Sequence, residues 1–492
     1  MTDLWSSSAQ LDDSSFSDQI GQKLMEISGA DKSPSDLMVE ASREYYYKYV
    51  YHYFPVLDVG HLTTDESSSL LLKHALCLVG VVMRQPREPD PLTEADQIYV
   101  KIKSLLFATH EKNFFIVLKV LCLLTVWNIK GPNIISMDNT WYRLSVAANL
   151  MISLGLHRDF ICAQKPQPGC ARRMAWSIFN LDKTMATVFD RPCILKPQDF
   201  DVRPLVPGDF ATSDRKNVIF MAYCKLGLIR HQTQALQAKS SQDLQQEGQK
   251  IVVSLKEWIQ TLPEAIHLYS TDNTKAYQRE IFELHIAYFA AIIHYCHQLD
   301  KVSQVSMGLF PSLVASSCIA RLYEEMNYRD DVGHLLTVHN WYSMMASAPL
   351  LSSCEEGQEE ADISRRELDI LETTLGLLRR KWYGARVIHD TIKRLRRGTR
   401  VGVSVATPRH PVSPLPLNDA QELFPFPNSL APRMKLLDDE WARPIFLSDE
   451  AELQLPDMDM SWIFDEFAGT YNTAFVNTRD FLDPESAMSL EL

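Results

Sequence analysis

One stretch decides the fold: it reads WYRLSVAANLMISLGLHRD over 141–159 and RRMAWSIFNLDKTMATVFDRPCILKPQDFDVRPL over 172–205. Its first half has small and apolar residues at three- and four-residue steps, which is the spacing of one helix face. Gly155 follows that face and can adopt the left-handed conformation that ends a helix. Two successive helices, over 138–154 and 171–188, are therefore predicted, with a turn between them.

Charged and aromatic residues in and after this turn form a signature. Its members are Gly155, His157, Arg158, Asp159, Arg172, Arg173, Trp176, Asp182, Arg191 and Pro192. The arginines lie close in sequence to several aspartates, and we expect some of these charges to form partly buried ion pairs that hold helices together. The signature is therefore interpreted as architecture. A ligand pocket at the same helices is the alternative, but the sequence does not place one.

The order and spacing of this signature resemble the central fungal-specific transcription factor domain, the middle homology region of fungal zinc-cluster regulators. A second similar segment, YHYFPVL over 51–57, lies upstream. The resemblance covers roughly residues 45–395 and implies an all-α fold and a role in transcription. Two departures indicate a divergent member of the family. Asp190 replaces the usual glycine of Gly-Arg-Pro, and Ala175 stands where the family has an aromatic residue.

Helical periodicity continues over most of the chain. Hydrophobic residues make up 46% of the 492 residues and charged residues 23%, so most of the chain can bury a core. We predict one large all-α domain of about ten to twelve helices, without a substantial sheet. The predicted helices span 65–84, 91–109, 113–130, 138–154, 171–188, 214–239, 242–261, 274–299, 311–327, 334–350 and 364–398. The predicted organisation is a disordered arm over 1–40, the helical domain over 41–398, a proline-rich linker over 399–440 and an acidic, aromatic tail over 441–492.

The last predicted helix carries two basic groups. Ser364 and Glu367 have the spacing of a capping box, which would begin this helix at Ser364. The basic residues are Arg379, Arg380 and Lys381, followed by Lys393, Arg394, Arg396 and Arg397. Their spacing resembles a bipartite nuclear-import signal, and a solvated helix face explains it equally well. Because the helix must also bury Trp382, it is a poor DNA-binding element on its own.

The tail is acidic and contains aromatic residues. Residues 401–492 contain 5 Lys+Arg and 16 Asp+Glu, a charge of 5 − 16 = −11 out of the total of −13. Acidic residues keep such a segment soluble, so its apolar side chains can meet a partner, as in a transcriptional activation segment. The candidate contacts are Met460, Trp462, Ile463, Phe464 and Phe467. The alternative is that the tail docks on its own domain.

The six-cysteine zinc cluster that usually precedes the resembled domain does not occur in this sequence. The nine cysteines are scattered, and none forms a Cys-x-x-Cys pair. The remaining 400 residues carry a charge of about −2, whereas phosphate contact needs a basic surface. We therefore expect a transcriptional activator that acts through a DNA-binding transcription factor or a homo- or heterodimer partner at a specialised gene set. The alternatives are a zinc-cluster protein whose N-terminal module is missing from this chain, and a helical scaffold or ligand-binding protein.

Catalytic and metal-binding motifs are not found in the sequence. It contains no Gly-x-Ser-x-Gly, Walker loop, dinucleotide fingerprint or His-Glu-x-x-His, so an enzyme is not expected. His294 and His297 could approach one metal ion on a helix, but no third ligand lies nearby in sequence, and no cofactor is predicted. No apolar run approaches the ~18 residues that span a bilayer. No signal peptide is evident, and the predicted location is the nucleus.

Overall fold

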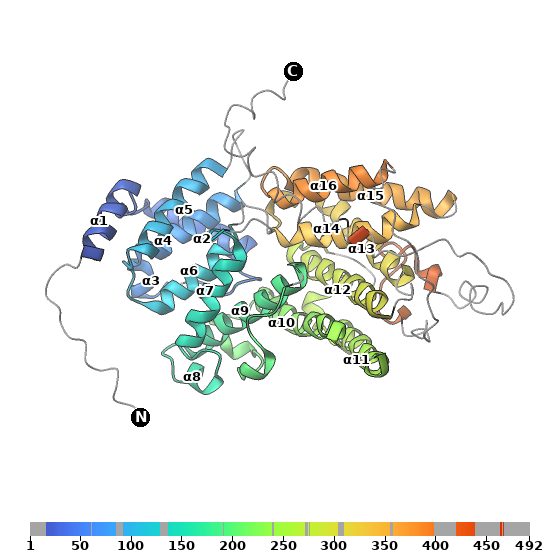
Figure 1. Ribbon diagram of the computed structural model, residues 1–492, viewed down its shortest axis with the longest axis horizontal. Coiled ribbons are helices and arrows are strands. Elements are labelled where there is room, and N and C mark those ends of the chain that lie inside the picture. Colours follow the sequence, from blue (N-terminus) through green and yellow to red (C-terminus); the bar gives the residue numbers. More distant parts are fainter. Residues whose placement is uncertain are drawn as a thin grey trace, which may run out of the picture.

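Sixteen α-helices, joined mostly by short loops, make up the part of the chain that the computed structural model describes (Figure 1). The described residues are 16–60, 62–84, 92–127, 136–189, 191–238, 241–270, 274, 276–303, 309–354, 358–397, 420–437, 463, 464 and 466. No β-strand occurs among them, so the all-α prediction is confirmed. The helices are α1 Phe16–Ser28, α2 Asp36–Tyr49, α3 Thr64–Ser68, α4 Leu70–Met83, α5 Leu92–Phe107, α6 Phe114–Leu124, α7 Thr140–Ser153, α8 Asp159–Ala163, α9 Pro168–Phe189, α10 Arg215–Gln234, α11 Ser241–Gln260, α12 Arg279–Ser303, α13 Leu309–Asn327, α14 Val338–Ser353, α15 Gln358–Leu378 and α16 Tyr383–Arg396.

Two helices, α4 and α6, are apolar around most of their circumference, and both lie in the core. Each begins at a side-chain cap: Ser69 accepts the backbone N–H of Leu72, and the side chain of Asn113 accepts that of Phe115. Lys119 of α6 is buried because it pairs with Glu66 of α3, which is itself part of a capping box. Within the described residues, no helix combines the length and apolar character needed to cross a membrane.

The helices pack mostly on their neighbours in sequence, and in Figure 1 they extend from α1 at the left of the view to α15 at the right. α2 packs on α4, which also contacts α5 and α6. The contacts continue through α7, α9 and α10 to α12, and then to α13, α14, α15 and α16. α12 forms the centre of the second half, because every residue from Arg279 to Cys296 is buried. It is the helix through which α10 on one side meets α13 and α14 on the other.

The helix number exceeds the predicted ten to twelve. Short helices such as α8 were not predicted because their periodicity covers less than two turns. The predicted helix over 364–398 is two helices, α15 and α16, because the backbone of Trp382 is extended at φ −120° and ψ 116°. The Trp382 side chain is buried there, and its Nε1 donates to the carbonyl of Leu335 at 3.1 Å.

The capping-box prediction is wrong. α15 begins at Gln358, so Ser364 lies inside the helix rather than at its start. The Ser364 hydroxyl donates to Ser353 at 3.0 Å, and Glu367 accepts hydrogen bonds from Ser317 at 2.6 Å and Arg433 at 3.0 Å. Both side chains are therefore used for packing between elements instead of for closing a helix end.

Two of the predicted boundaries also need correction. The arm predicted over 1–40 is wrong for residues 16–40, because α1 and the start of α2 lie there and Ser35 caps α2. The extended linker predicted over 399–440 is wrong for residues 420–437, whose apolar side chains pack into the core. The buried members are Leu423, Phe424, Leu430, Ala431, Leu436 and Leu437. Arg433 is 1% exposed and pairs with Glu367, which fixes the segment against α15.

Candidate functional site

The signature arginines join segments that lie far apart in sequence. Arg172 on α9 pairs with Asp159 at 2.8 Å, as predicted for partly buried ion pairs. Hydrogen bonds from Arg172 hold the pKa of Asp159 below its ordinary value. Arg173 is 2% exposed, and it donates to the backbone carbonyls of Pro55 at 2.7 Å and of Asp209. The two arginines therefore tie the YHYFPVL segment and the 3-10 turn Pro207–Asp209 to α9.

The other signature residues shape the turns on either side of α9. Gly155 has φ +75°, the left-handed conformation predicted for it, and an added Cβ would lie 3.1 Å from Ile161. Asp182 is fully buried and accepts the backbone N–H groups of Ile194 at 2.9 Å and Leu195 at 3.0 Å. Trp176 donates through Nε1 to the carbonyl of Arg203 at 2.9 Å.

The remaining members lie nearer the surface. The guanidinium of Arg158 pairs with Asp201 at 3.3 Å, and the carbonyl of His157 accepts the backbone N–H of Asp201 at 3.1 Å. The guanidinium of Arg191, just before Pro192, lies over the ring of Trp141 at 5.3 Å. These contacts join turns and helices of the chain, and the interpretation of the signature as architecture stays a prediction.

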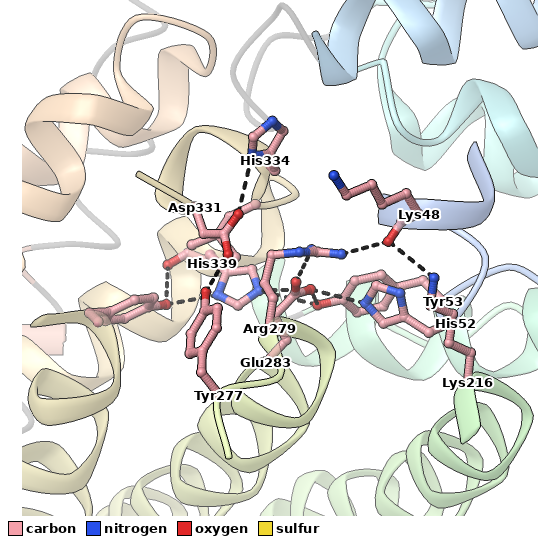
Figure 2. A network of polar contacts seen from close by, with 12 residues as sticks. Lys48, His52, Tyr53, Lys216, Tyr277, Arg279, Glu283, Asp331, His334 and His339 are labelled. Carbon is pink, nitrogen blue, oxygen red and sulfur yellow. Dashed lines mark hydrogen bonds and ion pairs between the residues drawn. The ribbon is translucent and has the colours of Figure 1, made fainter. Parts of the chain in front are cut away.

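A second polar cluster, which the sequence analysis missed, surrounds Glu283 of α12 (Figure 2). Its carboxylate accepts hydrogen bonds from His52 at 3.1 Å and Tyr53 at 2.6 Å, and it pairs with Arg279 one turn earlier. His339 of α14 lies 3.7 Å from the same carboxylate. We call these five residues the Glu283 cluster. It connects the YHYFPVL segment with α12 and α14.

Burial and charge together set the protonation states in the Glu283 cluster. Burial alone would raise the pKa of Glu283, but the charge of Arg279 and the contacts with both histidines hold it well below its ordinary value. Burial lowers the pKa of His52 and of His339, so both imidazoles are neutral at neutral pH. Burial raises the pKa of Tyr53 well above its ordinary value. The cluster therefore holds one carboxylate and one guanidinium as a closed ion pair.

The outer residues of Figure 2 extend this cluster to the surface of the helices. Arg279 also donates to the carbonyl of Lys48 at 2.8 Å, and Lys216 donates to the same carbonyl at 3.3 Å. Tyr277 donates to Asp331 at 2.5 Å. A sequence signal for this site existed, since His52 is a polar residue inside an otherwise aromatic and apolar segment.

Comparison with known proteins identifies the segment that carries the signature and the YHYFPVL sequence. Residues 44–262 match the family described as fungal specific transcription factor domain. Residues 44–262 are thus similar to a fungal transcription factor domain. That domain runs from the second half of α2 to the end of α11, so the Glu283 cluster joins it to helices that follow the matched region.

The chain is also similar to fungal proteins that are named as a transcription factor and as a regulatory protein. The chain is 27% identical over 222 residues to cutinase transcription factor 1 beta of Fusarium vanettenii, which covers 42% of this chain and 25% of that protein. It is 24% identical over 333 residues to the acetamidase regulatory protein of Aspergillus oryzae, and this match covers 63% of this chain and 41% of that protein. The chain thus spans less than half the length of these relatives. No solved structure matches the chain.

The basic groups that follow the fungal transcription factor domain are only partly accessible. The prediction that Lys381 belongs to a nuclear-import signal needs correction, because its side chain is 6% exposed and donates to the carbonyl of Gly333 at 2.6 Å. Burial lowers the pKa of Lys381 to about 8. Arg396 pairs with Asp369 and Glu372. The side chains of Arg379, Arg380, Lys393 and Arg397 are exposed. An import receptor would meet Arg379 and Arg380 in the turn after α15, and Lys393 and Arg397 at the end of α16.

The tail returns to the helical body at Ile463 and Phe464. Ile463 is fully buried and Phe464 is 7% exposed, with its ring 3.9 Å from that of His297 on α12. Glu466 pairs with Arg394 of α16 at 2.5 Å. Ile463, Phe464 and Glu466 therefore contact the helical domain, as in the alternative in which the tail docks on its own domain. In this docked state they are not available to a partner. Met460, Trp462 and Phe467 lie outside the described residues.

The histidine pair does not form a metal site in the described part of the chain. The ring of His297 packs against that of Phe464 at an interplanar angle of 40°, and Nε2 of His294 lies 3.3 Å from the side-chain nitrogen of Gln298. No group of three or more histidine, cysteine or acidic residues among the described residues converges in a way that could hold a metal ion.

Proposed function

We propose that this chain acts in the fungal nucleus as a transcriptional regulator, through a DNA-binding partner or dimer and an activating tail. The match of residues 44–262 to a fungal transcription factor domain carries this proposal. The named functions of the relatives, a transcription factor and a regulatory protein, support it. The near-neutral body and the acidic tail suit contact with proteins better than direct contact with phosphates.

Fusing the full chain to a heterologous DNA-binding domain tests the activating role. We expect the fusion to raise expression of a reporter gene, and we expect removal of residues 441–492 to abolish most of this increase, because the acidic and aromatic side chains would be lost. The matched control removes residues 1–15, which carry three aspartates and one tryptophan but none of the candidate contact residues of the tail. A fusion that activates equally well without residues 441–492 contradicts the proposal.

Direct DNA binding by the chain alone is the competing mode of action. Purified protein should show no sequence-specific shift of promoter fragments at physiological salt, since the body carries a charge of only about −2 and the chain as a whole −13. Specific binding of a duplex under those conditions would overturn the partner-dependent part of the proposal while leaving the transcriptional role intact.

The docked tail predicts that activation depends on undocking. In the full fusion, Arg394→Ala removes the ion pair with Glu466 and is expected to raise reporter output by about two- to five-fold, because an ion pair of this exposure contributes up to ~1 kcal/mol. The matched control is Arg386→Ala, which removes an exposed arginine of the same helix that pairs only loosely with Asp390. Equal output from both variants would show that docking does not limit activation.

A further inference from the structure

A cavity of about 60 Å³ lies where α9, α10 and α14 meet. Its walls are mostly apolar, and they include Phe54, Val126, Leu181, Met185 and Val338. By volume it has room for roughly four water molecules, or for an organic molecule of about four to six non-hydrogen atoms. Tyr53 also lines the cavity, so one of its walls is shared with the Glu283 cluster.

One charged side chain, Arg230 of α10, lines this cavity. It is 2% exposed, and its two terminal nitrogens reach only hydroxyl groups, those of Tyr342 at 3.4 Å and Thr184 at 3.2 Å. Its Nε has no hydrogen-bond partner. Across the ranges that the structure describes, no carboxylate lies within 4.0 Å of this guanidinium.

Three other buried guanidinium groups have the carboxylate partner that Arg230 lacks, whereas buried Arg143 donates to the backbone carbonyls of Leu124 and Asp138. Arg279 pairs with Glu283, Arg173 with Asp58 and Arg433 with Glu367. A buried cation without an opposite charge is costly, because hydroxyl dipoles replace only part of the lost hydration. An anion inside the cavity would supply the missing charge, and a guanidinium binds a carboxylate with two parallel hydrogen bonds.

We propose that this cavity binds a small aliphatic monocarboxylate, with its carboxylate on Arg230 and its short alkyl chain against Leu181 and Met185. The apolar walls favour an organic anion over an inorganic one, because an inorganic ion would leave those walls uncovered while losing its own hydration. A single negative charge matches the single guanidinium. The hydroxyl group of Tyr342 also lines the cavity and can donate to the carboxylate. The hydroxyl group of Thr184 already donates to the carbonyl of Asn180 at 2.8 Å, and it accepts from Arg230 and so orients the guanidinium. This site is independent of the proposed transcriptional role, since binding is a property of the purified protein.

Calorimetric titration of the full-length protein with acetate, propionate and butyrate tests the site, with propionamide and chloride as comparators at constant ionic strength. We expect propionate and butyrate to bind and to raise the thermal unfolding midpoint, and we expect the neutral propionamide to do neither. An equal effect from chloride would indicate an adventitious ion only and would overturn the proposal. Absence of binding by all three carboxylates would overturn it as well.

Two variants and one control locate the binding. Arg230→Met should weaken carboxylate binding by about ten-fold or more, since hydrogen bonds to a charged group are lost, without lowering the thermal midpoint of the ligand-free protein. Thr184→Val keeps the shape of the side chain, and it should weaken binding by several fold even if the Arg230 variant fails to fold. Arg386→Met on the exposed face of α16 should bind like the wild type. Wild-type affinity in both Arg230→Met and Thr184→Val would contradict the assignment.

Discussion

Replacing Glu283 with glutamine is expected to lower the free energy of unfolding by about 3–5 kcal/mol. The change removes the carboxylate that pairs with Arg279 inside the core, while His52 and Tyr53 also lose a charged acceptor. A buried guanidinium without its counter-ion must then keep its charge in a poorly solvated position. Chemical denaturation of the wild type and the Glu283→Gln variant, followed by circular dichroism, measures the difference.

A matched exposed pair provides the control for this variant. Asp362→Asn removes the partner of Arg365, and both side chains of that pair are about half exposed. We expect this change to stay within ~0.5 kcal/mol, because exposed ion pairs contribute little. The double change Arg279→Met with Glu283→Gln should recover part of the lost stability, since no buried charge is left unpaired. A Glu283→Gln variant as stable as the Asp362→Asn control would show that the Glu283 cluster does not stabilise the fold.

Acidification below pH 6.5 is expected to destabilise the protein steeply. Burial lowers the pKa of His285 to about 4 and that of His294 to about 3, whereas an unfolded histidine titrates near 6.5. The unfolded chain therefore binds more protons between about pH 6 and pH 4, so stability falls as the pH falls through this window. Two such histidines give a slope of nearly 3 kcal/mol per pH unit. Denaturant titrations at pH 7, 6 and 5 measure it.

Variants of single histidines test whether the buried imidazoles cause the fall in stability at low pH. His294→Gln should reduce the slope by about 1.4 kcal/mol per pH unit, because one buried base no longer titrates on unfolding. His110→Gln is the control, since His110 is exposed and its variant should leave the slope unchanged. A stability that is flat between pH 7 and pH 5 would mean that these imidazoles are accessible to protons in the folded state.

Local features of the fold were predictable because they depend on neighbouring residues. The helical class follows from apolar spacing, and the left-handed turn at Gly155 follows from a glycine at the end of an apolar face. The Arg172–Asp159 ion pair was also predictable from the sequence, since the two residues are only 13 positions apart. These predictions needed no knowledge of how distant helices meet.

Distant contacts explain what the sequence analysis missed. His52 and Glu283 are 231 positions apart, so their hydrogen bond leaves no periodic pattern in the sequence. Ser364 and Glu367 had the spacing of a helix cap, but Arg433, which lies 66 positions beyond Glu367, occupies both side chains instead. Lys381 counted as a surface charge for the same reason, because its partner is a carbonyl from another segment.

The Glu283 cluster also limits how far the chain can be shortened from its C-terminal end in a recombinant fragment. Residue 262, where the family match ends, precedes Arg279, Glu283 and His339 in the chain. A recombinant piece ending there would expose His52 and Tyr53 together with the apolar face of α10 that α12 covers. The smallest autonomous unit for expression and crystallisation therefore extends at least through Leu437, about 175 residues past the limit that family comparison alone would suggest.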